Sequence, residues 1–404
     1  MSNRQWTTVL ASCISFLGLG SPLCGQRTWI VDYLNRPGTD FVNFPAAIAA
    51  AADGDHIRLR TYAANFSQYS AADITKAVTI TGDGVPPVYL GTAPPQYSVT
   101  ISKVPAGKTV RIANVIIGGA LNIDTCAGLV CLDSIGKTSY GSDQTRVLAK
   151  NCAGVTISNS DLNGMGLAAE SPLYSIMSNV ALSNCTLIGA ASWSSIIPGN
   201  PAIQCNGGTL SLSQCDAYGG TYMSGFPPII WPALISQDTT LMVAGSSNRA
   251  ALKAGIGWPG VRAVVTTGGT VIMDPNVPLR DSSSMPDTVS GTAQVFIQRI
   301  PAVSTGKASL GGNLSVNIIS EAGVPYGAVI ALPTLPSSSS WGPLWVEANT
   351  MGILDIGIMG PLETKAIQVP LPSLPALLTL PLVVQAIAGN SALSISGPSV
   401  SVVR

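Results

Sequence analysis

Two aspartates, Asp161 and Asp216, hold the same position in two copies of a ten-residue repeat and are candidates for acid–base chemistry. Thr186 holds that position in the copy between them. If the copies stack as β-strands about 4.8 Å apart, the two carboxylates lie roughly 9.6 Å apart. Inverting glycosidases hold their acid and base about 6.5–9.5 Å apart, so the pair is a candidate catalytic site. Tyr218 and Tyr222 are candidate carbohydrate-binding platforms beside it.

A structural role is the competing interpretation of this pair. Aspartates that follow a bend are common on protein surfaces, and the sequence gives no sign of the burial that would raise one pKa and make that carboxyl an acid. We therefore expect catalysis by Asp161 and Asp216 only as an alternative.

The elements that would position these residues form a solenoid. The repeat has the pattern strand, bend, strand, turn, and it is clearest at residues 155–164, 180–189 and 210–219, with shorter copies at 110–114, 130–134 and 241–245. It recurs every 20 to 31 residues, which is typical of stacked coils with loops of variable length. A second series at 78–80, 99–101 and 121–123 predicts that each coil contributes strands to more than one sheet. At the bend stand amide side chains, which we expect to form a structural ladder: Asn114, Asn159, Asn184 and Gln214.

The beginning of the chain and its composition indicate an exported protein. Residues 1–25 contain Arg4, an apolar run and small residues near Gly25, a pattern typical of a secretory signal peptide. Lipidation at Cys13 is a weaker alternative. No later stretch has the roughly 18 apolar residues of a membrane span. The chain is 46% hydrophobic and 10% charged with no net charge, so we expect neither nucleic acid nor an anionic membrane as a partner.

Six cysteines follow residue 25, and an even number in an exported chain favours disulfides over zinc. Cys185 and Cys215 share an inward repeat position, so they are either a disulfide or a stack of free thiols. Cys126 and Cys131 are the other candidate pair. There is no CxxC motif, and His56 is the only histidine, so we expect no metal site and no cofactor.

The start of the solenoid resembles a known family. Residues 44–53 predict a short helix that covers the first coil, and residues 54–59 predict a strand after a tight turn. The helix with Ala47-Ile48, the segment 54–57, Tyr62, and the strand 78–84 ending in Gly-Asp-Gly resemble secreted right-handed parallel β-helix proteins of the pectin-lyase-like superfamily. Arg60-Thr61 departs from the Gly usual before that Tyr. The resemblance covers roughly residues 28–275.

The enzyme motifs of that superfamily are not matched. The Asp-Asp pair and Ser-His-Gly of polygalacturonase-like hydrolases are missing from the sequence. Residues 237–241 are only partly similar to a pectin methylesterase motif, and no dense acidic cluster suggests the calcium site of a pectate lyase. The resemblance therefore implies a fold rather than an activity.

The last part of the chain predicts a second domain. Short strands alternate with Pro and Gly breaks, which favours a small antiparallel β-sandwich. Its Trp341 and Trp345 are candidate sugar-stacking residues, although a Trp in a small sandwich is more often part of the core. The predicted organisation is a signal peptide at 1–25, a β-helix with an N-terminal helical cap at 26–290, and a sandwich at 291–404.

We thus expect an all-β protein, secreted or at the cell surface and a monomer. Its most consistent function is non-catalytic binding of an extracellular polysaccharide or a cell-envelope component. The alternatives are a polysaccharide-degrading hydrolase or lyase and a purely structural surface protein.

Overall fold

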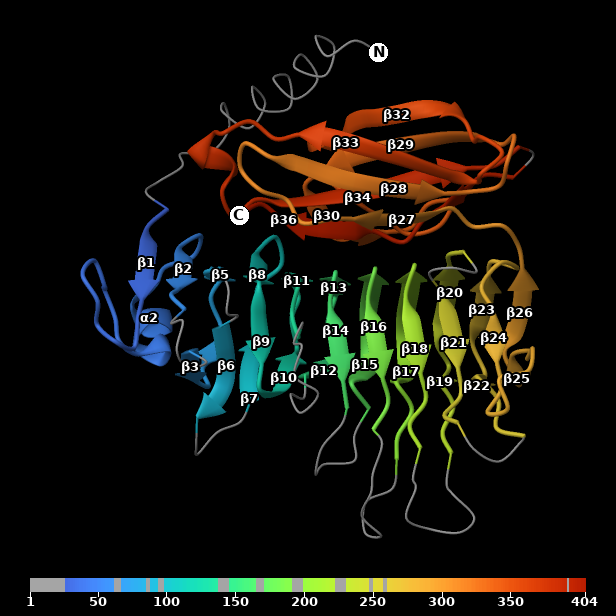
Figure 1. Cartoon of the computed structure of the whole chain (residues 1–404), viewed down its shortest axis with the longest axis horizontal. Coiled ribbons are helices and arrows are strands. Elements are labelled where there is room, and N and C mark those ends of the chain that lie inside the picture. Colours follow the sequence, from blue (N-terminus) through green and yellow to red (C-terminus); the bar gives the residue numbers. More distant parts are fainter. Residues whose placement is uncertain are drawn as a thin grey trace.

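A computed structural model describes residues 26–61, 67–84, 88–93, 98–136, 145–164, 171–190, 199–221, 230–246, 250–256, 260–390 and 392–404. The predicted signal peptide, Tyr62 and Tyr222 lie outside these residues. The described chain is almost entirely β-structure, with a parallel β-helix followed by antiparallel sheets, as the sequence predicts (Figure 1).

The β-helix has three columns of stacked parallel strands. The first column contains β1 (Thr28–Val31), β2 (His56–Leu59), β5 (Thr79–Gly82), β8 (Thr109–Ala113), β11 (Leu129–Asp133), β13 (Gly154–Ser158), the second halves of β15 (Leu173–Ser183) and β17 (Ile203–Ser213), β20 (Thr240–Ala244), β23 (Thr270–Met273) and β26 (Gln294–Ile297). The second contains β4 (Asp73–Ile74), β7 (Ser98–Ser102), β10 (Gly119–Asp124), β12 (Thr145–Lys150), the first halves of β15 and β17, β19 (Leu234–Gln237), β22 (Val264–Thr267) and β25 (Ser290–Gly291). The third contains β14 (Asp161–Asn163), β16 (Thr186–Ile188), β18 (Asp216–Tyr218), β21 (Ala251–Lys253) and β24 (Leu279–Arg280). Earlier coils have β3 (Ser67–Ser70), β6 (Val88–Ala93) and β9 (Val115–Ile117) at the equivalent place in the chain.

The bends of the repeat are the corners between the first and third columns. Asn159, Asn184 and Gln214 have φ values of 52°, 51° and 53°, the left-handed conformation in which Asn is favoured among residues with a side chain. Asn184 Nδ2 donates to Asn159 Oδ1 at 2.8 Å, and Asn159 Nδ2 donates to Asp133 Oδ1 at 3.0 Å. The predicted structural ladder of amides is therefore confirmed for Asn159 and Asn184, whereas the Gln214 side chain accepts from Ser304 Oγ instead.

Four cysteines stand directly after corner residues of this kind. The thiols of Cys126, Cys152, Cys185 and Cys215 each donate to the carbonyl oxygen two residues earlier, at 3.2–3.6 Å. The hydroxyl of Ser160 makes the same bond at the same corner, at 2.7 Å. The thiols thus act as corner donors inside the solenoid core.

The structure contains no disulfide among the six described cysteines. Cys126 points into the solenoid core, whereas Cys131 packs with Leu129 and Ala181 against the C-terminal domain outside the solenoid. The expected Cys126–Cys131 bridge is therefore opposed by the geometry, because the two side chains lie in different cores. The two cysteines are only five positions apart, and the sequence did not show that the bend between β10 and β11 sends their side chains into different cores.

A helix covers the N-terminal end of the β-helix, as expected. α2 (Phe44–Ala50) begins with Asn43 as its N-cap, whose side chain accepts from the Ala46 N–H, and it has Pro in its first turn. Its Phe44, Ala47 and Ile48 are buried in the solenoid core.

The C-terminal domain has two antiparallel sheets that enclose a separate core. One sheet contains β27 (Ala302–Thr305), β28 (Asn313–Ile319) and β33 (Thr364–Pro370), and the other contains β29 (Pro325–Ala331), β32 (Gly352–Ile358), β34 (Pro381–Ala388), β35 (Ser394–Ile395) and β36 (Ser399–Val402). A hairpin of β30 (Pro333–Ser337) and β31 (Leu344–Val346) lies beside them. β26, which the sequence assigns to the sandwich, pairs in parallel with β23 and so continues the solenoid. The sandwich therefore begins at β27 and not at residue 291.

The C-terminal domain lies along the first column (Figure 1). The outward serines of the solenoid satisfy the backbone of β27 and β36: Ser158 Oγ accepts from the Val400 N–H at 3.0 Å, and Ser213 Oγ accepts from the Val303 N–H at 2.9 Å. Ser183 Oγ lies 2.6 Å from Ser399 Oγ. These hydroxyls, which looked like a neutral exposed surface in the sequence, are buried between the two parts.

In the described part of the chain no helix is long and apolar enough to cross a membrane.

Candidate functional site

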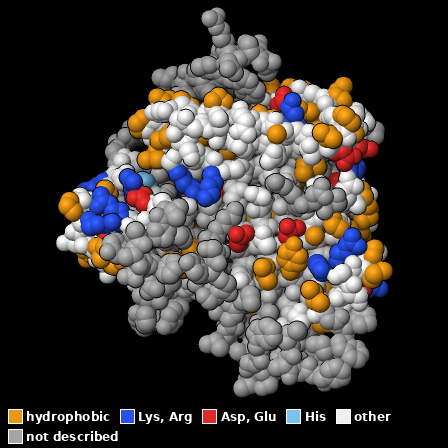
Figure 2. Space-filling view, in the orientation of Figure 1, with side chains coloured by type: hydrophobic (Ala, Val, Ile, Leu, Met, Phe, Trp, Pro, Cys, Tyr) orange, Lys and Arg blue, Asp and Glu red, His pale blue; other side chains and the backbone are white. Residues whose placement is uncertain are grey.

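The third column brings Asp161 and Asp216 onto one face of the solenoid, with Thr186 between them in register. Two strand steps of about 4.8 Å correspond to a separation of roughly 9.6 Å between the two residues. The strands of this column lie in front in Figure 1, and Figure 2 shows two separate acidic side chains near the middle of this view.

The electrostatic environment distinguishes Asp216. Both aspartates are partly buried, and burial raises the pKa of Asp216, against a hydrogen bond from the Ala251 N–H that lowers it. Burial and the neighbouring Asp216 raise the pKa of Tyr218. Tyr218 stands beside Lys253 in register. A general acid needs a raised pKa, so the burial of Asp216 gives this carboxyl a property that the sequence did not indicate.

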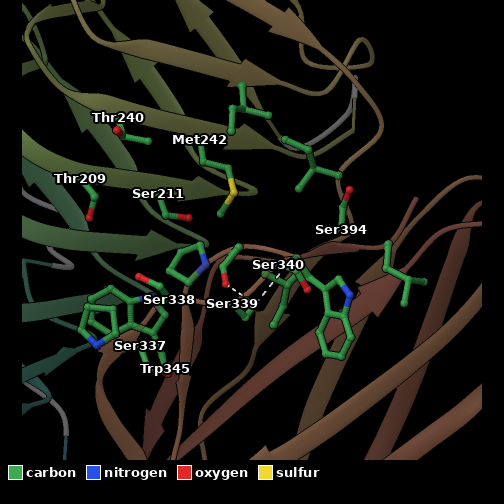
Figure 3. Close-up of a pocket in the computed structure, with 18 of the residues that line it drawn as sticks. Thr209, Ser211, Thr240, Met242, Ser337, Ser338, Ser339, Ser340, Trp345 and Ser394 are labelled. Atoms are coloured by element: carbon green, nitrogen blue, oxygen red, sulfur yellow. Dashed lines mark hydrogen bonds between the residues drawn. The ribbon is translucent and has the colours of Figure 1, made fainter. Parts of the chain in front are cut away.

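A cavity of about 630 Å³ lies between the β-helix and the C-terminal domain, and neither aspartate lines it. The outward side chains Thr209, Ser211, Thr240 and Met242 form its floor on the solenoid. Four consecutive serines, Ser337 to Ser340, and Trp341 form the opposite wall, at the end of β30 and in the loop that leads to β31 (Figure 3). Volumes of about 300–1,000 Å³ are usual for ligand sites. We call this cavity the interdomain cleft.

The two tryptophans of the C-terminal domain have different surroundings. Trp341 is 42% exposed at the cleft, and its loop is held by Ser339, which accepts from the Trp341 N–H at 3.2 Å and donates to Gly342 O at 2.6 Å. Trp345 is 1% exposed and packs in the apolar cluster between the two domains. Only Trp341 therefore presents a ring face on which a sugar can stack.

Two buried polar groups in the cleft lining have no partner among the described residues. They are the Ser211 hydroxyl and the Trp345 indole N–H. Ser211 is 6% exposed and Trp345 is 1% exposed, so bulk water reaches neither freely. Buried polar groups are nearly always paired, but eight other buried side-chain atoms of the described residues also lack a partner, so these two atoms do not by themselves mark a ligand site.

The cleft suits an uncharged ligand with many hydroxyl groups. None of the described residues that line it carries a charge, and its polar groups are serines, threonines and the amides Asn179 and Gln298. Such groups both donate and accept hydrogen bonds. Met242 and Ile272 add an apolar floor to the same lining.

Sequence reasoning found Trp341 and Trp345 but missed the rest of this cleft. Ser211 and Met242 occupy ordinary outward repeat positions, and only the docking of the C-terminal domain makes them special. The run of four serines before Trp341 was the one local signal, because such a run has no apolar side to bury.

Among the described residues no group of three or more His, Cys, Asp or Glu side chains is placed to hold a metal ion. No protein-family model matches the chain, and no curated protein matches it.

Proposed function

We propose that this protein binds an uncharged extracellular polysaccharide in the interdomain cleft, without cleaving it. The observation that carries the proposal is the combination of an exposed indole at Trp341 with a hydroxyl-lined, charge-free cavity. A sugar ring has an apolar face for the indole and a rim of hydroxyls for the serines.

Export belongs to this proposal. Residues 1–25 have the composition of a signal peptide, so the ligand would be met outside the cytoplasm. Membership of the pectin-lyase-like superfamily is likewise proposed, on the helical cap and the first coils. It is the fold of that superfamily, and not one of its activities, that supports our proposal.

A glycan array that holds neutral and acidic polysaccharides tests the class of ligand. We expect neutral glycans to bind and acidic ones such as pectin and alginate not to bind, because the cleft offers no Lys or Arg to a carboxylate. Binding should change little between low and high salt, since screening acts on charge pairs. Preferential binding of acidic glycans that salt abolishes would contradict the proposal.

A glycoside hydrolase acting through Asp161 and Asp216 is the second candidate. It is supported by their alignment in register across Thr186 and by the raised pKa of Asp216. The separation of roughly 9.6 Å lies at the upper limit of the range for an inverting pair. Asp216 would then be the acid and Asp161 the base.

An assay for new reducing ends and unsaturated uronate separates the two candidates. With neutral and acidic polysaccharides we expect neither product. If reducing ends form and Asp161→Asn and Asp216→Asn each abolish them in a folded protein, the carboxylates are catalytic and our proposal is wrong. A protein that neither binds nor cleaves any glycan would instead be a structural one.

A further inference from the structure

The C-terminal end of the β-helix is open. Along the inward column Leu241, Val271 and Val295, the exposed fraction rises from 0% and 1% to 41%. The parallel inward column ends at Ile297, which is 56% exposed. These side chains face the solenoid core, but no further coil covers them. Figure 1 shows no described element beyond β26.

The backbone of this last coil is also unpaired on one side. Gln294 and Gln298 donate their N–H groups to the preceding coil, at 3.1 and 3.0 Å. Because alternate residues of a strand point to opposite edges, the N–H and C=O groups of Val295 and Ile297 point toward the open end. No Asp, Glu, Lys or Arg occurs in residues 288–298. Natural proteins usually protect such an edge with charge, proline or a covering element.

The other end of the same core is closed. α2 buries Phe44 and Ile48 over the first coil. Because the helix covers the N-terminal end of every copy, the open C-terminal end of one copy cannot stack head to tail on the N-terminal end of another. The surface left to cover the inward columns that end at Val295 and Ile297 is therefore the open C-terminal end of a second molecule.

We propose that two copies of this chain associate through their open solenoid ends, with β26 of each pairing antiparallel about a two-fold axis at Phe296. This places Val295 opposite Ile297 of the second copy, so that both residues exchange backbone hydrogen bonds and both inward columns continue across the interface. The contact is isologous and closes at two copies. It replaces the monomer expected from the sequence.

Light scattering on the full chain tests the association. We expect twice the mass of the chain for the natural protein. Ile297→Pro removes an N–H that points to the open edge, and proline is tolerated on edge strands, so this variant should fold and be monomeric. Val295→Lys, which puts like charges at the interface, is a second variant that should dissociate the copies. As a control, Ile356→Lys changes an equally apolar residue, 69% exposed on β32, and should leave the mass doubled.

A cross-link tests the register. Directly opposed residues of a non-hydrogen-bonded antiparallel pair have Cα atoms about 4.5 Å apart, within the range for a disulfide. Phe296→Cys, treated with an added thiol oxidant, should therefore form a covalent dimer, while Ile356→Cys should not. A natural protein with the mass of one chain would overturn the proposal. A doubled mass that survives both edge variants, or that only Ile356→Lys abolishes, would also overturn it.

Discussion

Arg404, the last residue, donates from Nη2 to the Asp133 carboxylate at 3.1 Å, although 271 positions separate the two residues. Asp133 lies in β11 of the solenoid and its side chain is fully buried. The same carboxylate accepts from the Val402 N–H at 3.0 Å. This contact fixes the C-terminal domain on the solenoid and thereby holds the two walls of the interdomain cleft.

We expect Arg404→Ala to lower the free energy of unfolding by about 3–5 kcal/mol, because it leaves a buried carboxylate without its cation. Urea unfolding followed by fluorescence measures this. The control is Lys365→Ala, which breaks the more exposed pair of Lys365 with Asp355 at 3.7 Å and should cost less than about 1 kcal/mol. Equal effects of the two substitutions would contradict this account of the interface.

The single histidine predicts a pH dependence of stability. His56 is buried, and burial, with a smaller effect of Arg58, lowers its pKa from 6.5 to about 4. The unfolded chain therefore binds the proton more tightly, so this stability is fully present above pH 6.5 and is lost as the pH falls to about 4. The loss should approach about 3 kcal/mol. Relative to His56→Gln, the natural protein should weaken over this interval, and parallel pH profiles of the two proteins would refute the prediction.

The corner geometry of the cysteines predicts free thiols. Burial raises the pKa of Cys185 well above its usual value and that of Cys205 to about 12, so the reactive thiolate is scarce at these two residues. After unfolding without reductant, alkylation should modify Cys126, Cys131, Cys152, Cys185, Cys205 and Cys215 in full. A peptide that joins Cys185 to Cys215 would show instead that the neighbouring coils are bridged.

The substitution Ser211→Ala distinguishes a role of this residue in glycan binding from a role in the stability of the fold. Its hydroxyl has no partner among the described residues, so Ser211→Ala should leave the free energy of unfolding unchanged or slightly raised. The same substitution should weaken glycan binding, by about 1 kcal/mol for one lost hydrogen bond. Ser183→Ala is the matched control: it loses a bond to Ser399 and should destabilise the protein without a direct effect on the cleft. Unchanged binding by Ser211→Ala would remove this residue from the site.

Local regularities made the solenoid predictable. The corner amides, the alternating apolar residues and the helical cap are each encoded within one coil, and the residues that stack are equivalent positions of one repeat. The alignment of Asp161 with Asp216 followed from the same rule.

The contact between the two domains was not predictable in this way. The strands that touch the solenoid, β27 and β36, are only four residues long and rich in serine and threonine, and their hydroxyl residues are as buried as their valines, which the sequence does not show. Their partners on the solenoid, such as Ser158 and Ser213, have the composition of an exposed surface. Because hydroxyls pair with backbone across this interface, the cleft became apparent only in three dimensions.

The most direct test of binding in the cleft is calorimetric titration of a neutral oligosaccharide, selected on the array, into the natural protein, Trp341→Ala and Tyr218→Ala. Trp341 is exposed at the cleft and Tyr218 lies beside Asp216 on the third column, so the two variants remove one aromatic ring from each candidate site. We predict that Trp341→Ala weakens binding about tenfold, equivalent to about 1.4 kcal/mol, at unchanged stability, and that Tyr218→Ala binds like the natural protein. Full affinity in Trp341→Ala with loss in Tyr218→Ala would contradict the account and place the ligand on the face that carries the aspartates.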